Sequence, residues 1–287
     1  MNLYPEDIRS KVDADLRAPH AARNRLEPTR KQPRPARPGA GMGREFAAQP
    51  DEVLKSFNSW AFKREQPDDT ASLRRCVEAA MQVGRPIPFM LYWGRGERTQ
   101  PSEPESLCFQ FLAAMAKRIE NVYAPGASIT LVLTDTHAKL NGHCAASTDA
   151  YFAAVSAEAR AHGFAARRLS EFMALAGEGI ENSRPEIEPP AEILDALLAS
   201  AQRHYRGEGT AETGARRYFH CNMREKRVIE QAFPETVFLT FNGRDMRPLF
   251  PDRMPIFFMY SIRRGVSVKP WFIATTPEAA LVEPLRA

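Results

Sequence analysis

The sequence is poor in cysteine and has no long apolar run. Its 287 residues include only four cysteines, namely Cys76, Cys108, Cys144 and Cys221, and no two of them form a C-x-x-C pair. This spacing argues against both a disulfide framework and a zinc ribbon. No apolar stretch approaches the roughly 20 residues of a membrane-spanning helix, and the first residues carry acids where a secretory signal would be apolar. We therefore expect reduced thiols, no membrane partner and a cytoplasmic location.

Several catalytic motifs are also missing. The sequence has no G-x-S-x-G elbow, no Walker loop and no complete G-x-G-x-x-G, which disfavours a hydrolase, a P-loop enzyme and a standard dinucleotide enzyme. His137, His143 and Cys144 lie close together, and His220 and Cys221 follow later. Neither group has the regular spacing of a zinc site, so the sequence predicts no metal.

The positive charge is confined to the N-terminal segment. Residues 1–48 hold ten Lys/Arg and six Asp/Glu, which accounts for the net charge of +4. Residues 49–287 are therefore neutral overall and lack the basic excess that attracts nucleic acid. The segment 1–48 is rich in Pro, Arg and Gly, which predicts a disordered tail. We interpret it as solvated and dispensable, with transient binding to RNA or an anionic membrane as the alternative.

Residues 49–287 have the composition of one ordinary globular domain. The chain is 44% hydrophobic and 26% charged, and helical periodicity alternates with short apolar runs. This order predicts an α/β domain with a Rossmann-like, mostly parallel sheet and helices on both faces. Predicted helices cover 50–65, 68–84, 105–123, 147–163, 189–207 and 214–234, and buried strands cover 85–93 and 128–135.

The C-terminal region and two other segments are less regular. Strand-like runs at 236–246 and 254–274 flank a turn at Asn242 and Gly243, which predicts that the sheet ends in antiparallel strands. The segment 165–173 fits either a helix or a strand, and 177–190 reads as a loop placed to cover the site.

Ligands bind beyond the carboxyl ends of the strands in a parallel sheet, which selects the loops 94–104 and 134–144. In the first loop, glycines permit a close backbone approach and a pair of arginines is suited to a carboxylate or phosphate. A charged surface loop is the alternative interpretation. Arg98 is a catalytic candidate here, and the binding candidates are Tyr92, Trp93, Gly94, Arg95 and Gly96.

The second loop begins with Thr134 and Asp135. A carboxylate at this position can orient a hydroxyl or amine or act as a general base, although a simple capping role is an equal alternative. We take Asp135 and His137 as catalytic candidates and Thr134 as a binding candidate. The C-terminal third is dense in aromatic and basic residues, from which Tyr260 and Lys269 are chosen as contacts to an aromatic or cationic substrate.

Several ordered fragments resemble one known family. They include IPFMLYW, then SEPESLCFQFLAAMAKRIENVYAPGASITLVLTD, then FPETVFLTFNG and KPWF, within residues 75–272. In this order they resemble the isocyanide (isonitrile) synthases related to pyoverdine/paerucumarin and dityrosine biosynthesis proteins. The resemblance implies a Rossmann-like fold and conversion of the amino group of tyrosine or tryptophan to an isonitrile, with ribulose 5-phosphate as the carbon donor. It also implies that Asp135 matches the Asp that closes the family's second strand.

The chain departs from the family pattern at two places. Family members follow the first strand with a Pro-Ala-Lys-Ser-Pro-Asn type loop, whereas residues 94–98 contain no lysine. Arginine cannot replace lysine in forming a Schiff base, because its guanidinium is always protonated. The family's Pro-Trp-His appears here as Pro270, Trp271 and Phe272.

Three hypotheses about function follow. The first is an isonitrile-synthase-like transferase of secondary metabolite biosynthesis whose small-molecule substrate is an amino acid. The second is an S-adenosylmethionine-dependent transferase or cyclase, in which the Gly94 loop lies against the cofactor. The third is a catalytically inactive binding protein that finds its partner through the tail. The missing lysine favours the second hypothesis and the overall pattern favours the first. No pattern indicates an oligomeric state.

Overall fold

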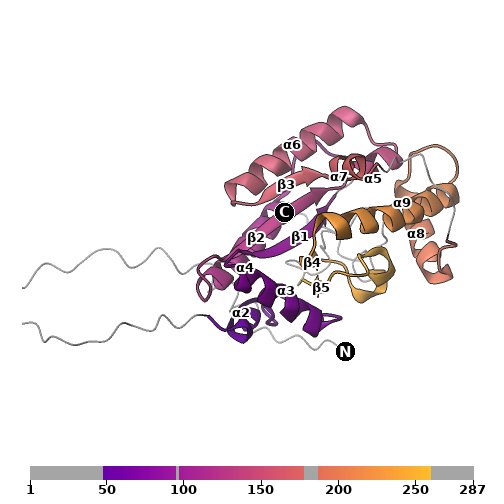
Figure 1. The fold of residues 1–287 in the computed structure, drawn as a ribbon. Coiled ribbons are helices and arrows are strands. Elements are labelled where there is room, and N and C mark those ends of the chain that lie inside the picture. The colour runs from indigo at the N-terminus through magenta and orange to yellow at the C-terminus, as the bar shows by residue number, and fades with distance from the viewer. Residues whose placement is uncertain (1–47, 95–96, 178–186, 260–287) are drawn as a thin grey trace, which may run out of the picture. The chain divides into compact units, whose positions relative to one another are not determined.

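The computed structural model describes residues 48–94, 97–177 and 187–259 (Figure 1). Four predicted site residues lie outside these ranges, namely Arg95, Gly96, Tyr260 and Lys269. Nearly all of the predicted tail and most of the predicted covering loop also lie outside the described residues. None of the described helices is both long and apolar enough to span a bilayer.

A single sheet of parallel strands forms the centre of the described region, with the strand order β3-β2-β1-β4-β5. The central strand β1 pairs with β2 along its whole length, from Ile87 opposite Ala127 to Trp93 opposite Leu133. This sheet confirms the predicted α/β fold. The strands are β1 (Ile87–Trp93), β2 (Ala127–Leu133), β3 (Ala165–Arg168), β4 (Val237–Thr240) and β5 (Ile256–Phe258).

The predicted antiparallel arrangement of the C-terminal strands is wrong for β4 and β5. β4 runs parallel to β1, and β5 runs parallel to β4 with Phe238 opposite Ile256. Asn242 and Gly243 lead into a short 3-10 helix, η1 (Arg244–Leu249), instead of a hairpin. The connection over residues 241–255 is long enough to return the chain to the starting edge of the sheet, as a parallel crossover requires. Among the described residues, only the bridge between Lys63 and Met259 is antiparallel.

Helices cover both faces of the sheet, as predicted (Figure 1). Side chains of β1 alternate between the faces: Phe89 and Trp93 pack on α2 and α4, whereas Met90 and Tyr92 face the core built by α7, α8 and α9. The first face carries α2 (Pro50–Phe57), α3 (Thr70–Gln82), α4 (Glu103–Glu120) and α6 (Ala145–Ala161). The second carries α5 (Asp135–Leu140), α7 (Leu169–Leu175), α8 (Ala191–His204) and α9 (Ala211–Ala232).

Local sequence signals explain several element boundaries. Asp69 caps α3 by accepting a hydrogen bond from the Ser72 N–H at 2.8 Å, and Gly84 follows that helix with φ +64°. The segment 165–173, which fitted either structure, forms β3 and then enters α7. Because the strands are parallel, the carboxyl ends of β1, β2 and β4 meet at one edge of the sheet. The strand order changes direction between β1 and β4.

Candidate functional site

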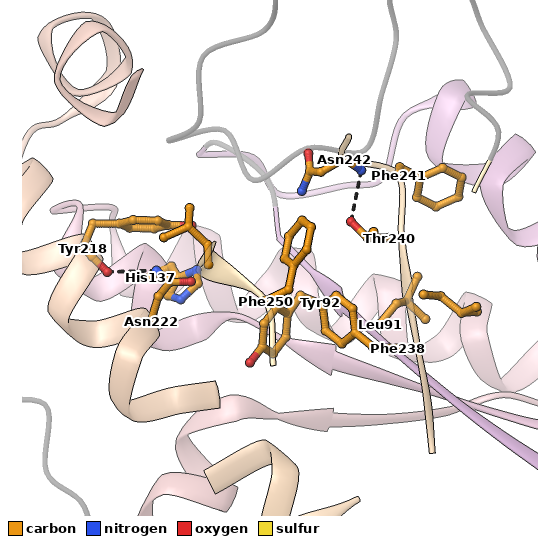
Figure 2. A pocket seen from close by; sticks show the side chains of 12 residues that line it. Leu91, Tyr92, His137, Tyr218, Asn222, Phe238, Thr240, Phe241, Asn242 and Phe250 are labelled. Carbon is orange, nitrogen blue, oxygen red and sulfur yellow. Dashed lines mark hydrogen bonds between the residues drawn. The ribbon is translucent and has the colours of Figure 1, made fainter. Parts of the chain in front are cut away.

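A cavity lies at the carboxyl ends of β1 and β4 and encloses about 440 Å³, part of it open to solvent (Figure 2). The space that water can occupy inside it is only about 20 Å³, which is room for about one water molecule. A larger ligand therefore fits only if lining side chains move. Open α/β sheets bind ligands at this switch in strand order. The lining residues are Leu91, Tyr92, His137, Tyr218, Asn222, Phe238, Leu239, Thr240, Phe241, Asn242, Leu249 and Phe250.

Three polar atoms of the cavity wall are buried and have no hydrogen-bond partner among the described residues. They are the Tyr92 hydroxyl, Nδ1 of His137 and Oδ1 of Asn242. An unsatisfied buried polar group costs about 1–3 kcal/mol, so such groups in a cavity indicate a place for the polar atoms of a ligand. Burial, reinforced by the negative charge of Glu225, raises the pKa of Tyr92 well above its ordinary value. Its phenol is therefore a neutral hydrogen-bond donor.

The fully buried carboxylate of Glu225, on α9, lies behind His137. Oε2 of Glu225 is 2.5 Å from Nε2 of His137, and Oε1 accepts hydrogen bonds from the Thr136 hydroxyl at 2.7 Å and the Cys221 thiol at 3.0 Å. Burial alone would raise the pKa of Glu225. The attraction to His137 in its protonated form and the hydrogen bonds from His137, Cys221 and Thr136 outweigh burial, and the pKa of Glu225 lies below its ordinary value. Glu225 is therefore ionised at neutral pH and holds the ring of His137 in place.

Helix geometry explains why these groups meet. Cys221 and Glu225 are four residues apart on α9 and share one face. Thr136 and His137 belong to the short helix α5, which begins directly after β2. The Tyr218 ring lies beside His137 with ring centroids 4.8 Å apart, and it flanks the cavity in Figure 2.

Donor atoms of His137, Cys221 and Glu225 lie within 4.8 Å of one another, close enough to suggest a metal site. Two ligands on a tetrahedral zinc ion are about 3.3 Å apart, given metal–ligand distances of about 2.0–2.1 Å. Nε2 of His137 and Oε2 of Glu225 are only 2.5 Å apart, which is the spacing of a charge-assisted hydrogen bond. We therefore describe the cluster as a hydrogen-bonded network, and the absence of a metal stays a prediction.

Asp135 is not among the residues that line the cavity. Its Oδ1 accepts hydrogen bonds from the backbone N–H groups of Thr136 at 3.1 Å and Ser170 at 3.0 Å, and its Oδ2 accepts from the Ser170 hydroxyl at 2.5 Å. These bonds join the end of β2 to the first turn of α7, which is the capping role weighed as the alternative. Its catalytic role stays a prediction.

Gly94 has a structural reason for lacking a side chain. A Cβ at this position would lie 2.0 Å from the Thr134 hydroxyl oxygen, so the glycine permits the ends of β1 and β2 to pack closely. Trp93 faces the opposite side of the sheet from the cavity, where its Nε1 donates a hydrogen bond to the Tyr151 hydroxyl at 3.1 Å. Of the three predicted residues at 92–94, Tyr92 is the one that lines the cavity.

Arg98 lies near a second buried carboxylate, that of Glu105, and its Nη1 is 3.8 Å from Oε2 of Glu105. Glu105 accepts hydrogen bonds from the Ser102 backbone N–H at 2.7 Å, from its hydroxyl at 2.6 Å, and from the Tyr151 hydroxyl. This network caps α4 on the face opposite to His137. The structure therefore brings Tyr92 and His137 to one cavity and leaves Arg98 and Trp93 on the other side.

Glu225 and its contacts are not among the residues predicted from the sequence. The buried stripe of α9 includes Tyr218, Cys221, Asn222, Glu225 and Val228. An acid within an apolar stripe at helical spacing was the available signal, because such a group is buried only when it has partners.

No family model and no curated protein matches the chain. Among solved structures, the PvcA protein from Pseudomonas aeruginosa is similar, with a TM-score of 0.56 and 18% identity over 78% of this chain and 87% of that chain. A tyrosyl-tRNA synthetase from Archaeoglobus fulgidus, complexed with L-tyrosine, has a TM-score of 0.47 and 13% identity over 73% of this chain and 63% of that chain. The likeness to PvcA shows a shared fold.

Proposed function

We propose that the chain is a small-molecule biosynthetic enzyme of the isonitrile-synthase type that acts on the amino group of an amino acid. The observation that carries this proposal is the cavity at the carboxyl ends of β1 and β4, where the buried pair of His137 and Glu225 meets the neutral phenol of Tyr92. The shared fold with PvcA and the family resemblance of the sequence supply the reaction type.

The cavity wall suits an aromatic amine. Phe238 and Phe250 provide ring surfaces for an apolar side chain, and their centroids lie 5.5 Å apart. Tyr92 can donate a hydrogen bond, and the free nitrogen of His137 can accept one. In Figure 2 the rings of Tyr92, Phe238 and Phe250 lie together, beside the polar groups contributed by α5 and α9.

The carbon donor requires a different attachment from a lysine Schiff base. Among the described residues that line the cavity there is no lysine or arginine, and residues 94–98 contain no lysine. We therefore propose that the amine of the substrate itself attacks the carbonyl carbon of a pentulose phosphate. The resulting imine links the two substrates, with loss of water.

The test is product formation by the purified full chain. The chain is incubated with tyrosine, tryptophan or an aliphatic amino acid, each with ¹³C-labelled ribulose 5-phosphate, and products are followed by mass spectrometry. A labelled isonitrile from an aromatic amino acid is the expected result. Reactions that lack the sugar phosphate are the control. Unchanged substrates in every mixture would contradict the proposal.

An S-adenosylmethionine-dependent transferase is the second candidate, and the missing lysine in residues 94–98 favours it. Thermal-shift measurements distinguish the two, because a ligand that binds the folded state raises the melting temperature. Stabilisation by ribulose 5-phosphate supports the first candidate. Stabilisation by S-adenosylmethionine alone would replace it with the second.

A further inference from the structure

We infer that His137 is a general base that acts through Nδ1, and that Glu225 is the positioning residue that fixes its tautomer. The identity of the proton that it removes, from the amino group of the substrate, rests on the proposed function. The assignment of the base and of its reactive nitrogen does not.

The hydrogen-bond partners of Glu225 determine which nitrogen of His137 carries the proton. An ionised carboxylate only accepts hydrogen bonds, so the ring nitrogen 2.5 Å from Oε2 must be the donor. That nitrogen is Nε2, which leaves the lone pair of the neutral ring on Nδ1. Nδ1 is buried and has no partner among the described residues, while the ring lines the cavity. The free lone pair is therefore available to a bound molecule.

The network also stabilises the ring after it has accepted a proton. The second oxygen of Glu225, Oε1, is held by Thr136 and Cys221, so the carboxylate cannot rotate away from the ring. A charged imidazolium next to a buried carboxylate gains more from their attraction than it would in water. An orienting carboxylate, a histidine and a reacting group in this order are the arrangement of other acid–base enzymes.

The proposed reaction begins with a proton transfer to His137. An N–H bond of the substrate ammonium breaks, a bond between hydrogen and Nδ1 of His137 forms, and the electron pair stays on the substrate nitrogen. This pair attacks the carbonyl carbon of the sugar phosphate. The former carbonyl oxygen takes one proton from the attacking nitrogen and a second from the imidazolium of His137, and then leaves as water. The product is a protonated imine, and His137 is neutral again at the end.

The tautomer can be measured without any substrate. In the full chain labelled with ¹⁵N-histidine, two-bond proton–nitrogen correlations should show a ring protonated at Nε2 and unprotonated at Nδ1. The signal is assigned by its loss in His137→Gln. A His137 ring protonated at Nδ1 would overturn the inference, as would a metal ion retained by the purified chain and lost in Cys221→Ala, because Nε2 would then be a ligand.

Kinetics test the catalytic role with a matched pair of variants. Glu225→Gln keeps the shape but removes the charge, and kcat should fall by about 10²–10⁴-fold with a smaller change in KM. Glu105→Gln alters an equally buried carboxylate on the other face and should leave kcat within a few-fold. Equal effects of the two substitutions would overturn the inference.

Chemical rescue guards against a variant that is merely misfolded. His137→Gly should lose activity to the same extent and regain part of it when imidazole is added, whereas Glu225→Gln should not respond. Absence of rescue in a folded His137→Gly variant would count against a base at this position. Failure of the proposed function is distinct, because the wild type would then form no isonitrile while the tautomer remained measurable.

Discussion

Glu225 and Glu105 are both fully buried near the carboxyl ends of the strands, but they lie on opposite faces of the sheet and differ in their partners. Glu105 accepts hydrogen bonds from Ser102 in its own first helical turn and from Tyr151. Glu225 binds an imidazole that lines a cavity. Burial of a charge therefore does not by itself indicate function in this chain. The distinguishing feature is a titratable partner with a second, free atom.

The largest difference in stability is expected when the two carboxylates are removed. Glu225→Ala leaves the donors of His137, Thr136 and Cys221 without an acceptor in the core, and should lower the free energy of unfolding by about 3–5 kcal/mol. Glu105→Ala should cost less, about 1–3 kcal/mol, because its partner Ser102 is only half-buried and Arg98 is partly exposed. Urea denaturation measures both values, and equal losses would remove the distinction.

Acid should affect the Glu225 network in a defined direction. The pKa of Glu225 is lowered in the folded state from an ordinary value of 4.5, so the folded protein holds this carboxylate in its ionised form more strongly than the unfolded chain does. The stabilisation is complete above pH 4.5 and is lost as the pH falls through the lower folded value. Glu225→Gln should therefore lose less stability than the wild type below pH 4.5. A parallel loss in urea titrations from pH 6 to about 3 would contradict this.

Asp135 is a third carboxylate near the carboxyl ends of the strands, and its role can be compared with those of Glu225 and Glu105. Asp135→Asn should lower stability by about 1.5–3 kcal/mol, since it weakens charged hydrogen bonds to Ser170 and Thr136. It should also reduce turnover, because it lies two residues before His137. Ser170→Ala removes the same side-chain bond without touching the carboxylate. If Ser170→Ala reproduces the kinetic effect, Asp135 acts as a cap; if turnover falls only in Asp135→Asn, it acts in catalysis.

The smallest effects on stability are expected at two tyrosines, one on each face. Tyr151→Phe removes the hydroxyl that joins Trp93 to Glu105, and should cost about 1 kcal/mol without changing turnover. Tyr92→Phe removes a buried hydroxyl that has no partner among the described residues, so stability should rise by about 1 kcal/mol while KM rises. Thermal melting and steady-state kinetics measure both. The opposite pattern would show that the cavity is not the site.

Much of the fold could be predicted because its signals are local. Contiguous apolar residues predicted β1 and β2, and helical periodicity over residues 68–84 predicted α3. Strand direction after β4 was not predicted. The dipeptide at Asn242 and Gly243 fits a hairpin locally, whereas the direction of β5 depends on the course of the chain through residue 255.

The candidate site shows the same division. The sequence shows that polar residues follow the central strands, and this places Tyr92 and His137 at the edge of the sheet where the cavity lies. Which of the predicted residues share a cavity, and that Glu225, 88 positions after His137, is the partner of its ring, follow from the packing of the helices on the sheet. Hydrophobic periodicity depends on near neighbours in the chain. The buried hydrogen bond between His137 and Glu225 depends instead on how distant helices pack together, which is decided by the whole core.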